Sequence, residues 1–294
     1  MGRGDSRPAT RRADLSGDRD GPDDRAARES ALSGGASGLL GHPETSGLPT
    51  IDYYFSAQDF EPADAQENYT EKLIALPHLG CCYEPFSGES VDPDLAALGI
   101  PAESPLLLCP GTPFKYAPRH DWIFPEIARR LGRCQFVFFK QQPQFLSEKL
   151  RQRLADEFAR AQLDFERYVV FVPKQPRPAF YGLMKRAHVL LDTIGFSGFN
   201  TAMQAVECGL PVVTREGRFM RGRFASGILK RMGLQELVAA TEQDYVELVV
   251  KIAQDPEYRD SIRMRIAASR HLLFEDLAPM RALEEFLIDA TRRR

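Results

Sequence analysis

The sequence predicts an α/β protein built on a doubly wound, Rossmann-like parallel sheet. Short apolar runs alternate with longer segments of helical periodicity along most of the chain. The stretch from Val189 to Thr214 has the pattern of a strand, a Gly-rich turn, a helix and a second strand, which is the βαβ unit of a parallel sheet. Ligands of such sheets bind beyond the carboxyl ends of the strands, so this stretch organises the prediction of function.

The elements expected in chain order follow from the apolar spacing and from Gly and Pro at the ends of runs. The predicted strands are 106–109, 134–139, 168–172, 189–191 and a β-branched run after Pro211. The predicted helices are 122–131, 145–165, 178–186, a segment beginning near Asn200, 219–232, 242–254, 257–274 and 278–290.

Composition divides the chain into three parts. Residues 1–47 are rich in Arg, Asp, Gly, Ser and Ala and predict a disordered tail. Residues 48–104 bring many aromatic side chains, which need a surface to pack on, so we expect an ordered, irregular arm or a strand followed by turns, with a linker over 87–105. Residues 105–294 form the predicted sheet domain with its carboxyl-terminal helices.

Charge and cysteine usage exclude several classes of protein. The net charge of −3 gives no reason to expect nucleic acid as a partner. Five cysteines, with neither a disulfide framework nor CxxC spacing, favour reduced thiols in a cytosolic protein. No apolar window is long enough for a membrane span, and no His, Cys and Asp set has metal-ligand spacing.

Polar loops after the strands should meet at one edge of the sheet. The helix that begins near Asn200 presents unpaired backbone N–H groups and a positive dipole end, which favour a phosphate. We therefore expect a nucleotide-phosphate site there. The loops contribute Thr112 and Lys115, then Lys174 and Arg177, then Ser197, Gly198, Asn200 and Thr201, and last Arg215, Arg221 and Arg223.

Several of these residues have a structural alternative. Ser197 or Asn200 could cap the helix. Gly198 either lets a ligand approach the backbone or only makes the turn. Lys174 and Arg177 lie among prolines and could be solvated loop charges.

For other polar residues the sequence favours a structural role over a catalytic one. Asp192 at a strand end more often pairs with a backbone N–H or an arginine than it acts in catalysis, and Glu207 is expected to be structural. Neither His120 nor His188 has a carboxylate partner that the spacing reveals.

A family resemblance joins these blocks. Residues 51–77, 106–118, 122–139 and 167–239 together resemble the carboxyl-terminal catalytic half of the O-linked N-acetylglucosamine transferase and SPINDLY-like glycosyltransferases, in particular bacterial members that follow tetratricopeptide repeats. The resemblance implies the second domain of a GT-B fold. It also implies a UDP- or GDP-linked sugar as donor, transfer to a hydroxyl with inversion, and no metal or other cofactor.

The resemblance assigns roles residue by residue. The family lysine that touches the diphosphate falls on Lys115, and its G-H-T-T helix start falls on residues 198–201. The ribose-binding acid falls on Gln204 and a glutamine on Thr112. A further family lysine falls near Lys174 or Arg177.

This chain also departs from the family pattern. Phe199 stands for a histidine, Asn200 for a threonine and Gln204 for an acid. These changes leave diphosphate recognition to Lys115 and the backbone.

We expect a domain that transfers a sugar from a nucleotide-sugar to a protein Ser or Thr hydroxyl, with Lys115 as the catalytic group. A complete GT-B enzyme has a first domain of comparable size, and residues 48–104 are too few to form one. The expected partners are therefore a nucleotide-sugar, a protein acceptor, and a separate first-domain or repeat chain. The alternatives are a non-catalytic half-transferase that binds a nucleotide or a protein, and a transferase for polysaccharide or lipid acceptors.

Overall fold

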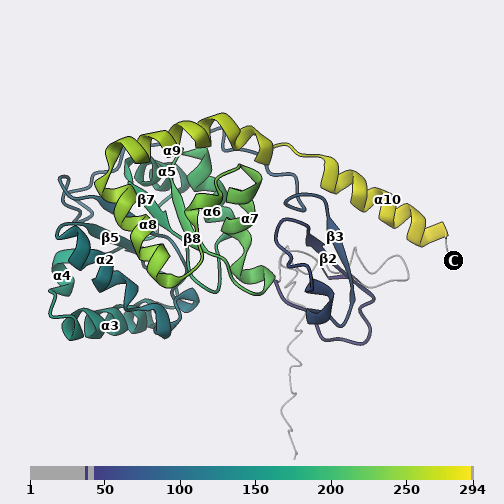
Figure 1. Ribbon diagram of the computed structural model, residues 1–294, viewed down its shortest axis with the longest axis horizontal. Helices are drawn as coiled ribbons and strands as arrows, with labels where there is room; N and C mark the ends of the chain where they lie inside the picture. Colours follow the sequence, from purple (N-terminus) through teal and green to yellow (C-terminus); the bar gives the residue numbers. More distant parts are fainter. Residues whose placement is uncertain (1–36, 39–42, 293–294) are drawn as a thin grey trace, which may run out of the picture.

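The protein is known from a computed structural model, which describes residues 37–38 and 43–292. Its larger body is a six-stranded, all-parallel sheet in the order β6-β5-β4-β7-β8-β9. This confirms the predicted doubly wound sheet. The larger body, with its helices, lies on the left of Figure 1. The disordered tail expected over residues 1–47 falls mostly outside the described residues.

The strands are short and largely buried. They are β4 (Leu106–Cys109), β5 (Gln135–Phe139), β6 (Val169–Val172), β7 (Val189–Leu191), β8 (Val212–Arg215) and β9 (Val238–Ala239). At the centre, Leu107 of β4 lies opposite Phe136 of β5 on one side and Val189 of β7 on the other. Every residue of β4, β5 and β7 is buried, as expected of a parallel sheet covered on both faces.

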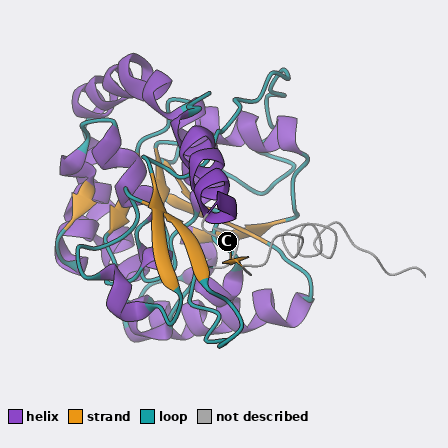
Figure 2. Cartoon of the chain, turned by 90° about the vertical axis from the view of Figure 1, so that its right-hand side faces the viewer, coloured by secondary structure: helices purple, strands orange, loops and turns teal. Residues whose placement is uncertain are grey.

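Helices cover both faces of this sheet (Figure 2). They are α2 (Ile123–Leu131), α3 (Gln144–Arg160), α4 (Phe165–Tyr168), α5 (Arg177–Arg186), α6 (Phe199–Glu207), α7 (Phe224–Arg231), α8 (Glu242–Gln254) and α9 (Pro256–Ser269). Right-handed crossovers place α2 and α3 on one face and α5, α6 and α7 on the other. Helix α8 returns to the first face, where it packs against α2.

A smaller body precedes the large sheet in the chain. Strands β1 (Ser37–Gly38), β2 (Tyr53–Ala57) and β3 (Lys72–Leu76) form a second parallel sheet in the order β1-β2-β3. The sequence predicted at most one strand followed by turns here. The residues between β3 and β4 form neither helix nor strand beyond Leu76, which agrees with the linker expected over 87–105.

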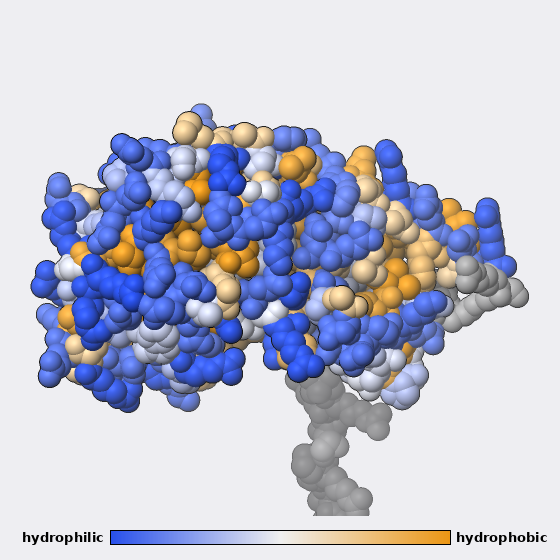
Figure 3. All heavy atoms as spheres, viewed as in Figure 1, coloured by the Kyte–Doolittle hydropathy of each residue, from blue (hydrophilic) through white to orange (hydrophobic). Residues whose placement is uncertain are grey.

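The last helix leaves the large body and covers the small sheet (Figure 1). This is α10 (Ala278–Arg292), whose Phe286 ring lies 5.0 Å from the ring of Tyr53 and 5.2 Å from that of Phe55. Apolar side chains gather on the surface of this small body, on the right of Figure 3, and include Leu287, which is 44% exposed.

Aromatic side chains join the two bodies. Phe60, which is 1% exposed, packs its ring against Phe199 of α6 at 5.7 Å and against Phe224 of α7 at 5.1 Å. A Cβ added to Gly227 of α7 would lie 2.5 Å from the carbonyl O of Asp59, so only glycine allows this close approach. The small body is therefore packed tightly onto the helices that follow β7 and β8.

The chain passes between the two bodies twice, and the two crossings are bonded together. His78 Nδ1 lies 2.6 Å from the Asp276 carboxylate, and the Glu275 N–H donates to the carbonyl O of Tyr83 at 3.0 Å. Arg231 of α7 also reaches Asp276, at 3.3 Å. Among the described residues, no helix is both long and apolar enough to cross a membrane.

Candidate functional site

Lys115 points at the loop that precedes α6. It ends a 3-10 turn (Pro113–Lys115) that begins just beyond β4. Its Nζ donates to the carbonyl O of Ser197 at 3.3 Å and lies 4.2 Å from the centre of the Phe196 ring. Burial lowers the pKa of Lys115, and the nearby Asp192 carboxylate partly opposes this effect. An ammonium group has three donors, so donors remain for a ligand.

Asp192 holds the loop between β7 and α6 in place. Its buried carboxylate accepts hydrogen bonds from the Ser197 hydroxyl at 2.7 Å, the Gly198 N–H at 2.9 Å and the Thr214 hydroxyl at 2.7 Å. Burial raises the pKa of Asp192, while these three donors and Lys115 act to lower it. Asp192 thus has the structural role that the sequence favoured, and it fixes the distance between Lys115 and the start of α6.

Ser197 belongs to the same hydrogen-bond network, which holds the loop between β7 and α6 in place. Its side chain is 1% exposed, and its oxygen also accepts the N–H of Ala225 at 2.9 Å. Its backbone N–H donates to the carbonyl O of Arg221 at 2.7 Å. The hydroxyl is therefore occupied by protein groups, and the backbone carbonyl of Ser197 is what faces Lys115.

The amino end of α6 has no side-chain cap. The sequence suggested Ser197 or Asn200 as the cap, but the N-cap residue is Gly198, whose N–H is held by Asp192. The cap prediction was wrong because the N-cap residue is a glycine, and the Ser197 hydroxyl is engaged by Asp192 and Ala225 instead. The N–H groups of the first helical turn have no carbonyl partner within the helix, so they remain donors for an anion.

Gly198 is required by a close contact rather than by its backbone angles. Its φ of −100° is open to any residue. A Cβ there would lie 2.2 Å from the Thr201 hydroxyl oxygen, so a glycine lets this side chain fold back over the turn. Asn200 is exposed and Gln204, one turn further along α6, is half-buried.

The other predicted site residues lie in different surroundings. The carbonyl O of Thr112 accepts the Lys115 N–H at 2.9 Å, so Thr112 shapes the lysine turn. Lys174 is exposed in the loop after β6. Arg177 lies over the rings of Phe86 and Tyr181, 4.5 and 5.6 Å from their centres, so its contacts are with protein side chains. Glu207 accepts from the Phe86 N–H, the structural role expected of it.

The end of β8 and the segment that follows it carry three arginines with different partners. Arg223 pairs with Glu216 at 2.6 Å and donates to the carbonyl O of Gly217, and Arg221 pairs with Glu44. Arg215 keeps a buried Nε that has no hydrogen-bond partner among the described residues. The first two thus have protein counterions.

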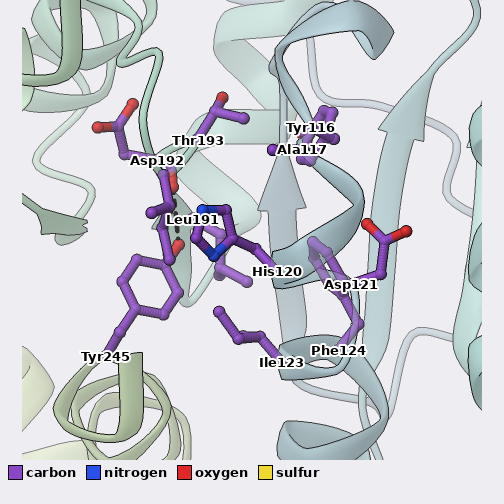
Figure 4. A pocket seen from close by; sticks show the side chains of 11 residues that line it. Tyr116, Ala117, His120, Asp121, Ile123, Phe124, Leu191, Asp192, Thr193 and Tyr245 are labelled. Carbon is purple, nitrogen blue, oxygen red and sulfur yellow. Dashed lines mark hydrogen bonds between the residues drawn. The ribbon is translucent and has the colours of Figure 1, made fainter. Parts of the chain in front are cut away.

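Sequence reasoning missed the contact of a buried histidine, His120, with a carboxylate beside this site; His120 itself is drawn in Figure 4. His120 Nδ1 lies 3.0 Å from the Glu242 carboxylate, and its Nε2 accepts from Arg119 Nε at 3.0 Å. Burial is the main cause that lowers the pKa of His120, with Arg119 and Arg215 acting in the same direction and Glu242 against them. No spacing signal could reveal a partner so far along the chain.

A small pocket of about 20 Å³ lies behind His120 (Figure 4). It has room for about one water molecule and is lined mostly by apolar groups, with Tyr245 donating from α8 to the carbonyl O of Asp192 at 2.9 Å. It is too small for a nucleotide. In the described ranges, no group of His, Cys, Asp and Glu could hold a metal ion.

Comparison with known proteins points to one family. Residues 151–276 match the model of glycosyl transferase family 41. The chain is 28% identical over 238 residues to the probable UDP-N-acetylglucosamine–peptide N-acetylglucosaminyltransferase SPINDLY of Petunia hybrida and to that of Arabidopsis thaliana. It is 24% identical over 243 residues to the UDP-glucose:protein N-beta-glucosyltransferase of Actinobacillus pleuropneumoniae.

The alignments cover much more of this chain than of its relatives. They span 77% of this chain but 24% of the two SPINDLY proteins, and 79% of this chain but 36% of the Actinobacillus protein. The chain thus spans about a quarter of the length of the SPINDLY proteins that it matches.

Solved structures agree on the fold. The chain superposes on an O-GlcNAc transferase mutant of Thermobaculum terrenum with a TM-score of 0.74 and 24% identity, over 87% of this chain and 48% of that one. It also superposes on sucrose-phosphate synthase of Thermosynechococcus elongatus with a TM-score of 0.57 and 16% identity, over 81% of this chain and 57% of that one. The chain is thus similar to glycosyl transferase family 41 over residues 151–276 and distantly similar to the SPINDLY proteins, and it shares its fold with a bacterial O-GlcNAc transferase.

Proposed function

We propose that this chain is the nucleotide-sugar-binding half of a glycosyltransferase that transfers a sugar from a UDP- or GDP-sugar to a hydroxyl group of a protein. The SPINDLY proteins are named as UDP-N-acetylglucosamine–peptide transferases and the Actinobacillus protein as a UDP-glucose:protein transferase, which supports a UDP-sugar donor and a peptide or protein acceptor. The observation that carries the proposal is the 3.3 Å contact of Lys115 Nζ with Ser197 O, which holds an ammonium group beside the open amino end of α6.

In the proposed reaction, Lys115 and the amino end of α6 act by electrostatic stabilisation. In the transfer step the acceptor oxygen bonds to the anomeric carbon from the face opposite the leaving group, the bond from that carbon to the diphosphate oxygen breaks, and the acceptor proton passes to a base or solvent. Negative charge grows on the diphosphate, where Lys115 and the N–H groups of α6 stabilise it. A lysine at ~4 Å contributes on the order of 4 kcal/mol at an effective dielectric of 20. The helix end adds about 0.3–2 kcal/mol.

With this charge compensation the proposed mechanism is metal-independent. Attack from the face opposite the leaving group inverts the configuration of the anomeric carbon. Asp192 acts through position, because it holds the carbonyl of Ser197 against Lys115. Thr112 supports the lysine turn from the other side. Asn200, Thr201 and Gln204 lie on the first turns of α6, where they can contact the diphosphate and the ribose.

The experiment is a calorimetric titration of UDP, GDP and UDP-sugars into the wild type and the Lys115→Ala variant. Hydrogen bonds to charged groups contribute about 1.5–3 kcal/mol, so we expect binding weakened about 10- to 150-fold. Lys149→Ala, which removes an exposed lysine from α3, is the matched control and should bind as the wild type does. Equal affinity of wild type and Lys115→Ala, or no binding by either at millimolar ligand, overturns the proposal.

We propose as a second candidate function a half-transferase that binds a nucleotide or a partner protein and transfers nothing by itself. Among the described residues, the body beside the nucleotide domain is a three-stranded sheet covered by α10, a smaller unit than the nucleotide domain. A separate first-domain or repeat chain would then complete the enzyme.

A transfer assay separates the two functions. Radiolabelled UDP-sugar is incubated with the chain and with protein, polysaccharide and lipid acceptors. Label on protein supports the transferase, and label only on polysaccharide or lipid corrects the acceptor class. Tight nucleotide binding that depends on Lys115, without transfer to any acceptor, selects the binding module.

A further inference from the structure

A polar cleft lies on the large sheet, at the edge opposite to the one that holds Lys115. It has a volume of about 350 Å³ and opens at the amino ends of β4 and β7, between the end of α5, the side of α9 and the turn at 101–104. Ligand sites in proteins occupy about 300–1,000 Å³, so the cleft is large enough for a small molecule. Four of its lining side chains carry a permanent positive charge, namely Lys185, Arg186, Arg259 and Arg263.

These four cations have few counterions. Asp260 is the one carboxylate among the described residues that line the cleft. Asp92 lies 3.9 Å from Arg186, but both side chains are more than half exposed, and such a pair contributes little. Lys185 donates to a neutral group, the hydroxyl of Ser90, at 2.8 Å. The cleft therefore keeps a net positive charge.

The two arginines of α9 are held in place while most of their donors stay unused. Arg263 donates to the carbonyl O of Ala187, at the end of α5, at 2.7 Å. Arg259 donates to the carbonyl O atoms of Ile252 and Ala253, at the end of α8, at 2.9 and 3.3 Å. A guanidinium has five N–H donors, and these contacts engage one nitrogen of each. The Nε of Arg263 is buried with no hydrogen-bond partner among the described residues.

His188 adds a neutral donor at the base of the cleft. Its Nδ1 accepts the N–H of Leu106 at 3.1 Å, so the proton of the neutral ring is on Nε2. Burial, together with Arg259 and Arg263, lowers the pKa of His188 to about 4. The ring therefore stays neutral near pH 7, and the charge of the cleft comes from the lysine and the arginines.

We propose that this cleft binds the phosphate group of a small phosphorylated ligand. The planar guanidinium groups of Arg259 and Arg263 match phosphate oxygens in geometry, and Lys185 and Arg186 close the open side with further positive charge. A recessed cleft of this size favours a soluble phosphate ester over a flat membrane. The site is separate from the nucleotide site and does not depend on the proposed function.

The test is a calorimetric titration of inorganic phosphate and of pyrophosphate into the full chain that carries Lys115→Ala, which suppresses the nucleotide site. We expect one binding event that this substitution leaves unchanged. The double variant Lys185→Gln and Arg186→Gln, made in the same background, should weaken it at least about tenfold, since each lost charged hydrogen bond contributes about 1.5–3 kcal/mol. Both side chains are exposed at the end of α5, so the fold should survive.

The matched control is Arg129→Gln with Arg160→Gln, two exposed arginines on the opposite face, which should bind phosphate as the parent does. Co-sedimentation with phosphatidylcholine vesicles, with and without phosphatidic acid, then tests whether the bound phosphate belongs to a lipid headgroup or to a soluble ester. Co-sedimentation that needs both phosphatidic acid and the two α5 side chains assigns a lipid headgroup, and binding in solution alone assigns a soluble ester. No binding in either format, or binding equally strong in the α5 double variant, overturns the proposal.

Discussion

Asp192 illustrates how one buried carboxylate can set the geometry of a site without touching a ligand. Its two oxygens receive three donors, from Ser197, Gly198 and Thr214, and these bonds connect β7, the start of α6 and β8. The same carboxylate lies close enough to Lys115 to influence its pKa. The position of the lysine and the shape of the loop therefore depend on one residue.

Replacing Asp192 by Asn should damage both stability and binding. The amide presents N–H groups to donors that need an acceptor, and a buried donor left without a partner costs about 1–3 kcal/mol. We expect a lower free energy of unfolding by about this amount in urea titrations, and weaker UDP binding by calorimetry. Asp289→Asn, an exposed change on α10, serves as the control. Unchanged UDP affinity in Asp192→Asn would show that the loop does not need this carboxylate.

The lowered pKa of His188 predicts how the free energy of unfolding depends on pH. Its pKa falls from 6.5 to about 4 in the folded protein, because it is buried beside Arg259 and Arg263. Between these values the unfolded chain binds more protons than the folded one. The stabilisation that the neutral ring provides is thus fully present above the unfolded pKa and is lost as the pH falls through this window.

His188→Asn tests this effect. Asparagine can accept the N–H of Leu106 but cannot take up a proton, so unfolding free energy should fall less between about pH 7 and about pH 5 than in the wild type. Urea titrations at several pH values measure the slope. Identical slopes in the two proteins would mean that His188 is not responsible.

At the residue scale, the sequence located Lys115 well but not its surroundings. The strand-end rule and the family resemblance both pointed to the lysine, and its ammonium does lie at the loop before α6. Neither could reveal that the Ser197 hydroxyl accepts the N–H of Ala225, or that the Arg177 guanidinium lies over the Phe86 ring. Those contacts depend on tertiary packing between segments that no local pattern connects. The roles of all the predicted site residues stay predictions.

Helix α8 has the clearest local signal of any element. Thr241 and Asp244 form a capping box, in which the Thr241 oxygen accepts the Asp244 N–H at 3.0 Å and the Asp244 carboxylate accepts the Thr241 N–H at 2.9 Å. The helix then presents Glu242 to His120 and Tyr245 to the backbone of Asp192. Its first turn therefore braces the site from behind.

Thr241→Ala should lower the free energy of unfolding by about 0.5–2 kcal/mol, since N-cap contacts are worth about this much. The loss should appear in urea titrations. Thr241→Ser keeps the oxygen and should recover most of it. A Ser variant as unstable as the Ala variant would indicate that packing of the threonine methyl, and not the cap, is responsible.

Element prediction succeeded for most of the large body. Helix α8 and strands β4 and β7 were predicted with the bounds that the structure has. Helix α4 was missed, because four residues are too few for helical periodicity to be read. Strand β9 has two residues, too few for any alternation to be read. The pairing of β2 with β3 was missed because parallel strands need no turn signal between them.

At the scale of the whole molecule, Phe60 is the main apolar link between the two bodies. Phe60→Ala removes a side chain that is 1% exposed and contacts Phe199 and Phe224. We expect a loss of about 3–5 kcal/mol in the free energy of unfolding. Hydrogen exchange of the β2 and β3 amides should accelerate more than that of the large sheet, because the small body loses its anchor.

Phe158→Ala, an equally buried change within the large body, is the control. It should destabilise the large sheet without selective loosening of β2 and β3. If both variants accelerate exchange uniformly through the chain, the two bodies unfold as one unit and Phe60 is no special link.

The bonded crossings between the bodies have a mechanical consequence. Because His78 meets Asp276, and Tyr83 meets Glu275, both connections pass through one spot, and Arg231 ties that spot to α7. Together with the packing of Phe60 on α6 and α7, this spot attaches the small body to the large one at two places. Two separate attachments resist rotation of one body against the other, which a single attachment would allow.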